Sequence, residues 1–238
     1  MKIPKNTKLL ITGAPRSGTY FTTRLLFNLG LNIRHESVDT NGTVSSVHLI
    51  NPTGFTKIVH QIREPLKSIC SLHKIDWLGQ ELQSDSKNDE NFTGHFNVNQ
   101  LHKKNYDIKL RGDTWSFFLN KVKDRNLTRK CMKAYLYWNE LAVRESEFTY
   151  TLEGVLESNK SFNSWIESLG LIPEESDYAT TLNFIGTTDI TNKELGSYDT
   201  NNKFGGIKVA PDLTWEILES LDSELVSKIK DLTNSFYS

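Results

Sequence analysis

The segment Lys8–Leu29, KLLITGAPRSGTYFTTRLLFNL, limits the possible folds of this chain more than any other stretch. It begins with a short apolar run, Leu9–Ile11, which is typical of a buried parallel strand. A turn of small residues follows from Gly13 to Thr19. Apolar side chains then recur at helical spacing, at Phe21, Leu25, Leu26 and Leu29. A strand, a glycine-rich turn and a helix in this order bring backbone N–H groups and the positive end of a helix around one anion, so we predict a phosphate-binding loop.

The charge of this loop differs from that of a nucleoside-triphosphate P-loop. Gly13 and Gly18 have the P-loop spacing, but Thr19 stands where such a loop has lysine. The positive charge is instead inside the loop, at Arg16. We expect the backbone N–H groups from Ser17 to Tyr20 to bind a phosphate oxygen, with the Ser17 and Thr19 hydroxyls as further donors.

A second strand and its ending support a different kind of ligand. The segment Phe55–Ile62, FTKIVHQI, is rich in β-branched and apolar residues and is predicted to be the next long parallel strand. A Walker-B strand ends in a carboxylate that holds Mg²⁺, whereas this strand is followed by the cation Arg63. The pattern argues against hydrolysis of a magnesium nucleotide. It suggests a ligand with two separated phosphate-type groups, one at the loop and one at Arg63.

The order of the predicted elements defines the fold class. A helix is expected from Glu64 and Pro65 onward, because proline favours the first helical position. Two strand–helix units of this length predict an α/β, P-loop-containing three-layer α/β/α fold with a central parallel sheet. We expect a single domain over residues 1–238, since no boundary or repeat is visible.

The remaining elements are predicted from local patterns. Further strands are expected at Leu31–Ile33 and Phe148–Leu152, and residues 74–112 and 171–204 are polar and loop-like. The predicted helices are Asp113–Lys123, Thr128–Glu145, Phe162–Leu169, Asp212–Ser220 and Asp222–Phe236.

Composition excludes several classes of function. The chain has 238 residues and a formal net charge of −1, so nothing favours nucleic acid as a partner. Cys70 and Cys131 are expected to be reduced thiols, and no cluster has the spacing of a metal site. No apolar run approaches the ~20 residues of a membrane span. The N-terminal residues run directly into the first strand, so we expect no signal peptide and a cytoplasmic protein, whose oligomeric state the sequence does not indicate.

Two motifs together resemble the sulfotransferases that use 3′-phosphoadenosine 5′-phosphosulfate (PAPS). The first is the loop P-R-S-G-T after a strand, and the second is Arg63 with Ser71 eight residues later. The resemblance implies that the loop binds the 5′-phosphosulfate and that Arg63 and Ser71 bind the 3′-phosphate. Ser68 is a competitor for the role of Ser71, because it lies on nearly the same face of the predicted helix. The implied loop residues are Pro15, Arg16, Ser17, Gly18, Thr19 and Tyr20.

The resemblance also gives Arg16 a catalytic role. Sulfuryl transfer moves negative charge onto the oxygen between sulfur and phosphorus as that bond breaks. A cation at this oxygen stabilises the transition state more than the ground state. The family often has lysine at this position, and a guanidinium can span a sulfuryl and a phosphate oxygen together.

An acceptor hydroxyl needs a general base, and the segment R-H-E-S contains two candidates. In several bacterial carbohydrate sulfotransferases the base is a glutamate at about this distance from the loop, so we favour Glu36. His35 is the alternative, since other branches of the family use histidine. His60, within a strand, is interpreted as a core histidine.

The sequence therefore predicts a transferase of the PAPS-dependent sulfotransferase class. It would pass a sulfuryl group to a hydroxyl of a small molecule or glycan and release adenosine 3′,5′-bisphosphate (PAP), with no metal required. The polar segments favour a carbohydrate acceptor over a hydrophobic phenol. The alternatives are a P-loop kinase of a small metabolite and a nucleotide-binding module without catalysis.

Overall fold

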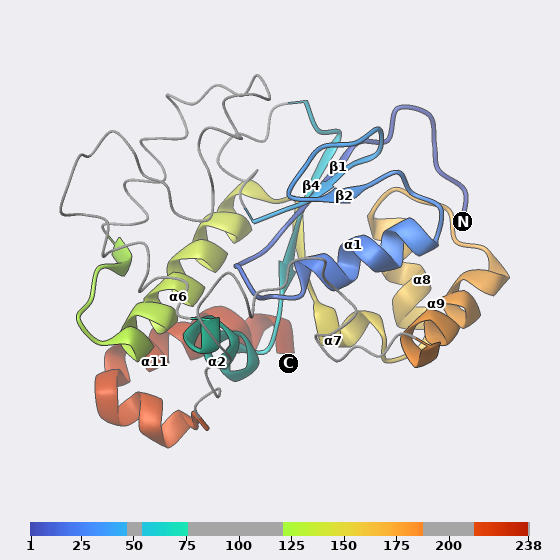
Figure 1. The fold of residues 1–238 in the computed structure, drawn as a ribbon. Coiled ribbons are helices and arrows are strands. Elements are labelled where there is room, and N and C mark those ends of the chain that lie inside the picture. Colours follow the sequence, from blue (N-terminus) through green and yellow to red (C-terminus); the bar gives the residue numbers. More distant parts are fainter. Residues whose placement is uncertain (47–53, 76–120, 188–211, 238) are drawn as a thin grey trace. The chain divides into compact units, whose positions relative to one another are not determined.

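A computed structural model describes residues 1–46, 54–75, 121–187 and 212–237 of the chain (Figure 1). The chain divides into two compact units. The first contains residues 1–64, 138–199 and 233–238, and the second contains residues 65–137 and 200–232. The predicted helix Asp113–Lys123 and the polar segment 74–112 lie almost entirely outside the described residues. That the chain forms one domain stays a prediction.

The first unit contains a parallel sheet of five strands, so the predicted α/β class is confirmed (Figure 1). The strands lie in the order β2-β3-β1-β4-β5, and every neighbouring pair is parallel. Because β1 lies between β3 and β4, its carboxyl end is the point where the strand order reverses, and ligands bind at such points in open α/β sheets. The bounds are β1 Leu9–Thr12, β2 Arg34–His35, β3 Gly42–Val44, β4 Lys57–Ile62 and β5 Phe148–Thr151.

The register aligns the ends of β1, β2 and β3, whereas β4 continues for two residues beyond His60, the partner of Thr12. Ile11 of β1 is paired with Val44 of β3 and with Val59 of β4, and Val44 is paired with His35 of β2. The segments that follow these strands therefore leave the sheet along one edge, and this edge collects the predicted site residues.

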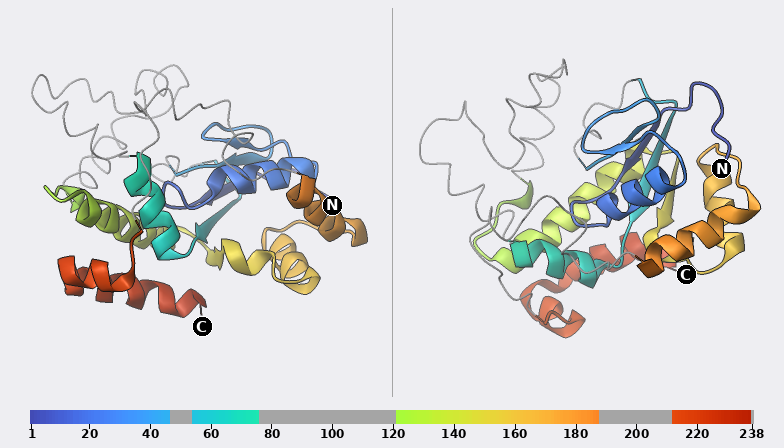
Figure 2. Two further views of the ribbon diagram at one scale, coloured as in Figure 1. Left: turned by 60° about the horizontal axis from the view of Figure 1, so that its bottom comes forward. Right: turned by 45° about the vertical axis from the view of Figure 1, so that its right-hand side comes forward.

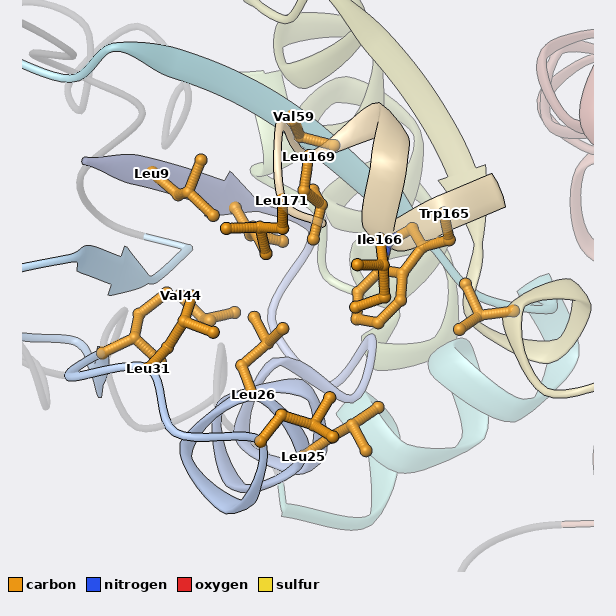
Figure 3. Close-up of a cluster of buried hydrophobic side chains, with 14 of the residues drawn as sticks. Leu9, Leu25, Leu26, Leu31, Val44, Val59, Trp165, Ile166, Leu169 and Leu171 are labelled. Atoms are coloured by element: carbon orange, nitrogen blue, oxygen red, sulfur yellow. The ribbon is translucent and has the colours of Figure 1, made fainter. Parts of the chain in front are cut away.

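One face of the sheet is covered by α1 (Thr19–Asn28), α8 (Asn159–Ser168) and α9 (Glu175–Thr187). Figure 3 shows how the apolar side chains of the strands meet those of α1 and α8. Phe162 of α8 and Tyr178 of α9 pack with ring centroids 5.6 Å apart, and these two helices lie next to each other in Figure 2. The buried members include Leu9, Val44, Val59, Leu25, Leu26, Trp165 and Ile166.

The opposite face contacts α6 (Leu127–Glu145), whose residues from Trp138 onward belong to the same unit. The side chain of His60 in β4 reaches Asn139 of α6, so the sheet has helices on both faces. This is the predicted three-layer arrangement. The other helices are α2 (Pro65–Ile75), α7 (Leu152–Val155) and α11 (Trp215–Tyr237).

Several predicted boundaries are confirmed by capping residues. Gly30, with φ 95°, follows α1 and donates its N–H to the carbonyl of Phe27 at 3.0 Å. Gly170, with φ 77°, ends α8 in the same way. In α11 the backbone leaves the helical region at Asp222, whose carboxylate accepts the Leu225 N–H at 3.0 Å. This break separates the two predicted C-terminal helices.

Two predictions are wrong. Leu31–Ile33 is not a strand, because the Ile33 N–H bonds locally to the Leu31 carbonyl at 3.0 Å, and pairing begins only at Arg34. Leu31 and Ile33 are apolar because they fill the core. The segment 171–204 contains α9, whose start is fixed by the Asp177 carboxylate accepting the Glu174 N–H at 2.8 Å. Threonine and asparagine residues in this helix interrupt the helical spacing of its apolar residues, so the sequence pattern did not indicate a helix.

His60 is a buried and fully hydrogen-bonded histidine. Its Nε2 donates to Asn139 Oδ1 at 3.0 Å, and its Nδ1 accepts from the hydroxyl of Thr149 at 3.1 Å. Only the neutral ring with its proton on Nε2 satisfies both contacts in this way. Burial lowers the pKa of His60 from 6.5 to about 4, which the hydrogen bond to Asn139 opposes.

This histidine predicts a loss of stability in mild acid. Because its pKa is lower in the folded than in the unfolded state, the unfolded chain binds more protons below pH 6.5 and stability falls as the pH falls toward 4. We expect the wild type to lose about 3 kcal/mol more than His60→Gln between pH 7 and pH 4, measured by urea unfolding. Parallel stability curves for the two proteins would contradict this account.

Candidate active site

The loop between β1 and α1 needs both of its glycines. A Cβ atom on Gly13 would lie 2.5 Å from the Gln61 carbonyl oxygen and 2.6 Å from Ser17 Oγ. Gly18 has φ 89° and forms the N-cap of α1, and a Cβ there would lie 2.5 Å from a methyl group of Leu152. The loop therefore packs its backbone directly against β4 and α7, and α1 begins immediately after it.

The hydroxyl of Ser17 is suited to an anionic ligand. The Ser17 N–H donates to the Ala14 carbonyl at 3.0 Å, so this N–H is used within the loop, unlike our expectation from the sequence. The side chain is fully buried, and its Oγ has no hydrogen-bond partner in the part of the chain that the structure describes. A buried hydroxyl without a partner, at the start of a helix, fits a loop that binds a phosphate-type group. Pro15 and Tyr20 are half-buried on either side.

Two guanidinium groups meet at this loop. Arg63, immediately after β4, donates from Nη1 to the backbone carbonyl of Arg16 at 3.3 Å. Burial lowers the pKa of Arg16, and the nearby charge of Arg63 lowers it further. Arginine stays protonated in spite of such shifts, so the two like charges create a positive potential that favours an anion. In this structure Arg63 contacts the loop itself rather than lying apart from it.

A network of hydrogen bonds between uncharged side chains joins the loop to β4 and β5. Gln61 of β4 donates from Nε2 to the Ser17 carbonyl at 2.8 Å. Its Oε1 accepts from the hydroxyls of Thr22 at 2.5 Å and Tyr150 at 2.7 Å. Burial raises the pKa of Tyr150, so the phenol keeps its proton and remains a donor. Sequence reasoning missed this network, for which the only signal is a glutamine within an otherwise apolar strand.

Changing Gln61 to glutamate is expected to destabilise the protein. The substitution replaces the amide group that donates to the Ser17 carbonyl by an oxygen and introduces a buried charge. We expect Gln61→Glu to lower the free energy of unfolding by about 2 kcal/mol or more, measured by urea denaturation. Thr22→Val, which removes one donor without adding charge, is the matched control and should have a smaller effect. A Gln61→Glu protein as stable as the wild type would contradict the assigned network.

The two candidate bases lie beside the same loop. His35 Nε2 and Thr19 Oγ1 are hydrogen-bonded at 3.0 Å, and the His35 ring meets the Tyr20 ring edge-on with centroids 5.5 Å apart. Burial lowers the pKa of His35, Glu36 opposes this shift and Arg16 adds to it. His35 is therefore neutral near pH 7, and it is tied to the first residue of α1.

Glu36 is held by the end of β3. Its Oε1 accepts from the N–H of Ser46 at 3.1 Å and from the Ser46 hydroxyl at 2.9 Å, and its Oε2 accepts from the hydroxyl of Ser45. His35 Nε2 lies 3.7 Å from Glu36 Oε1. Sequence reasoning missed both serines, because β3 was not recognised as a strand. The signal that could have found them is Gly42-Thr43-Val44 before the serine pair.

Backbone strain is concentrated at this site. Among the described residues, the non-glycine positions with positive φ are Asn6, Arg16 and Glu36, at 66°, 70° and 54°. L-residues rarely adopt this conformation, and it is found preferentially at functional sites. Two of the three positions, Arg16 and Glu36, are predicted catalytic residues.

Most of the predicted site residues are thus brought together in the first unit. The exception is Ser71, which lies half-buried in α2 of the second unit, where Ser68 is fully buried. The choice between these two serines stays a prediction. Within the described ranges, no group of three or more His, Cys, Asp or Glu side chains could hold a metal ion. No helix in those ranges is long and apolar enough to cross a membrane.

Comparisons with known proteins give a likeness of fold. No protein-family model matches the chain, and no curated protein matches its sequence. Among solved structures, it is similar to mouse sulfotransferase SULT7A1 complexed with PAP, with a TM-score of 0.45 and 10% sequence identity. The match covers 98% of this chain and 85% of that chain. A likeness at this level carries no information about ligand or reaction, which have to be argued from the site.

Proposed function

We propose that this protein is a sulfotransferase that takes a sulfuryl group from PAPS and passes it to an acceptor hydroxyl. The observation that carries the proposal is the contact between Arg63 and the backbone of Arg16, at 3.3 Å, on a glycine loop at the switch point of a parallel sheet. Two guanidinium groups at such a loop suit a ligand with more than one anionic group.

Each part of the loop has a role in holding this donor. The Ser17 hydroxyl and the N–H groups at the start of α1 would bind the 5′-phosphosulfate. Arg63 would bind the 3′-phosphate, with Ser71 as its partner by the spacing of the family motif. PAPS supplies an activated sulfuryl group when bound, and the protein fixes its orientation through these contacts.

Arg16 would stabilise the charge that develops during transfer. Its backbone φ is 70°, and its half-buried side chain keeps much of its charge away from water. A preorganised cation in such surroundings acts strongly on charge that appears in the transition state. Glu36 is the favoured base for the acceptor hydroxyl and His35 the alternative. His35 is hydrogen-bonded to Thr19 of the loop, and Glu36 Oε1 lies 3.7 Å from His35 Nε2.

The acceptor is proposed to be a small molecule or glycan, with a carbohydrate hydroxyl favoured by the polar segments of the sequence. The cytoplasm is the proposed location. Neither assignment changes the chemistry of the donor site.

The main rival is a small-metabolite kinase. It is less well supported because β4 places the neutral amide of Gln61 beneath the loop and is followed by Arg63, where a Walker-B strand supplies a carboxylate for Mg²⁺. The second rival is a nucleotide-binding module without catalysis. The strained positions of Arg16 and Glu36 favour catalysis over simple binding.

Calorimetric titration with PAP and with ATP–Mg²⁺, followed by transfer of labelled sulfate from PAPS to a panel of glycans and phenols, tests the proposal. We expect PAP to bind at least tenfold more tightly than ATP–Mg²⁺ and PAPS to be consumed. Tight binding of ATP–Mg²⁺ without binding of PAP would establish the kinase. Binding of PAP without any turnover of PAPS would establish the binding module.

A further inference from the structure

The carboxylate of Glu36 is fixed by several hydrogen bonds from the protein. Its two oxygens accept three hydrogen bonds, from the Ser45 hydroxyl, the Ser46 hydroxyl and the Ser46 N–H. Both serines are buried, and the Ser45 N–H also donates to the carbonyl of Ile11 in β1 at 2.8 Å. The donors are therefore fixed to the central strands of the sheet rather than to a loose surface turn.

The distribution of these bonds leaves a defined position open. A carboxylate has about four lone-pair sites, two on each oxygen. Oε1 uses both of its sites on Ser46, whereas Oε2 uses one on Ser45. Among the residues that the structure describes, one lone pair of Oε2 thus remains for a further donor. The αL backbone at Glu36, with φ 54°, and its N–H bond to the Val44 carbonyl at 3.1 Å fix the base of the side chain.

His35 is engaged in a different way. Its Nε2 is hydrogen-bonded to the Thr19 hydroxyl at 3.0 Å, and the 3.7 Å between Nε2 and Glu36 Oε1 is too long for a hydrogen bond. The imidazole therefore links the turn after β2 to the start of α1. In this arrangement it orients Thr19, and that contact already uses its Nε2.

We propose that Ser45 and Ser46 are positioning residues that fix Glu36 as the general base and direct the free lone pair of its Oε2 to the acceptor hydroxyl. The inference rests on the proposed sulfotransferase function. Glu36 Oε2 takes the proton of the hydroxyl, whose oxygen forms the new bond to sulfur. The bond between sulfur and the bridging oxygen breaks, and that oxygen leaves on PAP with the electron pair.

The experiment uses Ser45→Ala, Ser46→Ala and the double variant, each in the wild-type and the Glu36→Ala background. Ser37→Ala, in the same turn, is the matched control. Three quantities are measured: the rate of PAP release from PAPS, the Kd of PAP by calorimetry, and the midpoint of urea unfolding. Water serves as the acceptor in the rate measurement when no other acceptor is supplied. Including the Kd and the unfolding midpoint separates positioning from folding and from donor binding.

We expect each serine substitution to slow PAP release roughly tenfold in the wild-type background, with the Kd of PAP unchanged. In the Glu36→Ala background the same substitutions should cause no further loss. The unfolding midpoint should fall in the wild-type background and stay unchanged or rise when the carboxylate is absent, because the serines then have no hydrogen bond to the Glu36 carboxylate left to lose.

The failures of the two proposals are distinguishable. Serine variants that turn over PAPS at the wild-type rate, or that lose activity equally in both backgrounds, would overturn the positioning role while the sulfotransferase function stands. A His35→Ala loss larger than that of Glu36→Gln would make His35 the base. If the wild type binds no PAP, the proposed function fails. In that case, serine substitutions that shift the urea unfolding midpoint equally in the wild-type and Glu36→Ala backgrounds would also overturn the role inferred for the serine contacts with Glu36.

Discussion

Replacing Arg16 with alanine is expected to lower kcat by roughly 10² to 10³-fold, because a preorganised donor to the developing charge is lost. The affinity for PAP should change much less, since PAP lacks the sulfuryl group that Arg16 would contact in the transition state. The measurement is the initial rate of PAP release at saturating PAPS, together with the Kd of PAP.

The control for this substitution is Arg24→Ala, which removes an exposed arginine from α1. Arg16→Lys should recover part of the rate, because a cation is retained without the planar fork. The φ of 70° is equally unfavourable for arginine, lysine and alanine, so the three proteins are comparable in backbone strain. Normal turnover by Arg16→Ala would remove this residue from the chemical step.

Replacing Arg63 with alanine is expected to weaken PAP binding by roughly 100-fold, the effect of removing one partner of a charge-assisted contact with phosphate. The affinity for AMP, which has no 3′-phosphate, should change by less than tenfold. Calorimetric titration of the wild type and the variant with both nucleotides provides the comparison.

The comparison of the two nucleotides also identifies which phosphate Arg63 binds. Arg63 donates to the Arg16 carbonyl at 3.3 Å, so it also supports the loop. If the variant loses PAP and AMP affinity equally, Arg63 serves the 5′-group or the loop, and the assignment to the 3′-phosphate is wrong. Arg24→Ala again controls for the loss of one positive charge.

The parts of the molecule that follow local patterns could be predicted from the sequence. The apolar run of β1, the glycines of the loop and the apolar stripe of α1 are all adjacent in the chain, so their order defines a strand, an anion-binding turn and a helix. Arg63 could be identified as an anion-binding candidate because it ends a strand parallel to β1. His35 and Glu36 could be named as candidate bases from the R-H-E-S segment, and the structure joins His35 Nε2 and Thr19 Oγ1 of the loop by a hydrogen bond at 3.0 Å.

The parts that depend on register between distant segments could not be predicted. Ser45 and Ser46 approach Glu36 only because β3 pairs with β2 and β1, and β3 has three residues. Gln61 donates to the Ser17 carbonyl because β4 lies beside β1. The hydrophobic periodicity of neither segment reveals this pairing. The sequence alone therefore indicated the candidate site residues but not the residues that hold them in place, such as Ser45, Ser46 and Gln61.

The central claim is that the loop and Arg63 together bind the two phosphate-type groups of one nucleotide. A crystal structure with PAP tests it most directly, because the 5′-phosphate of PAP marks where the sulfuryl group is attached. We predict the 5′-phosphate at Ser17 and the N-terminus of α1, the 3′-phosphate within hydrogen-bond distance of Arg63, and Glu36 Oε2 facing the free side of the 5′-phosphate. A nucleotide bound elsewhere, or with its 3′-phosphate directed away from Arg63, would contradict the account.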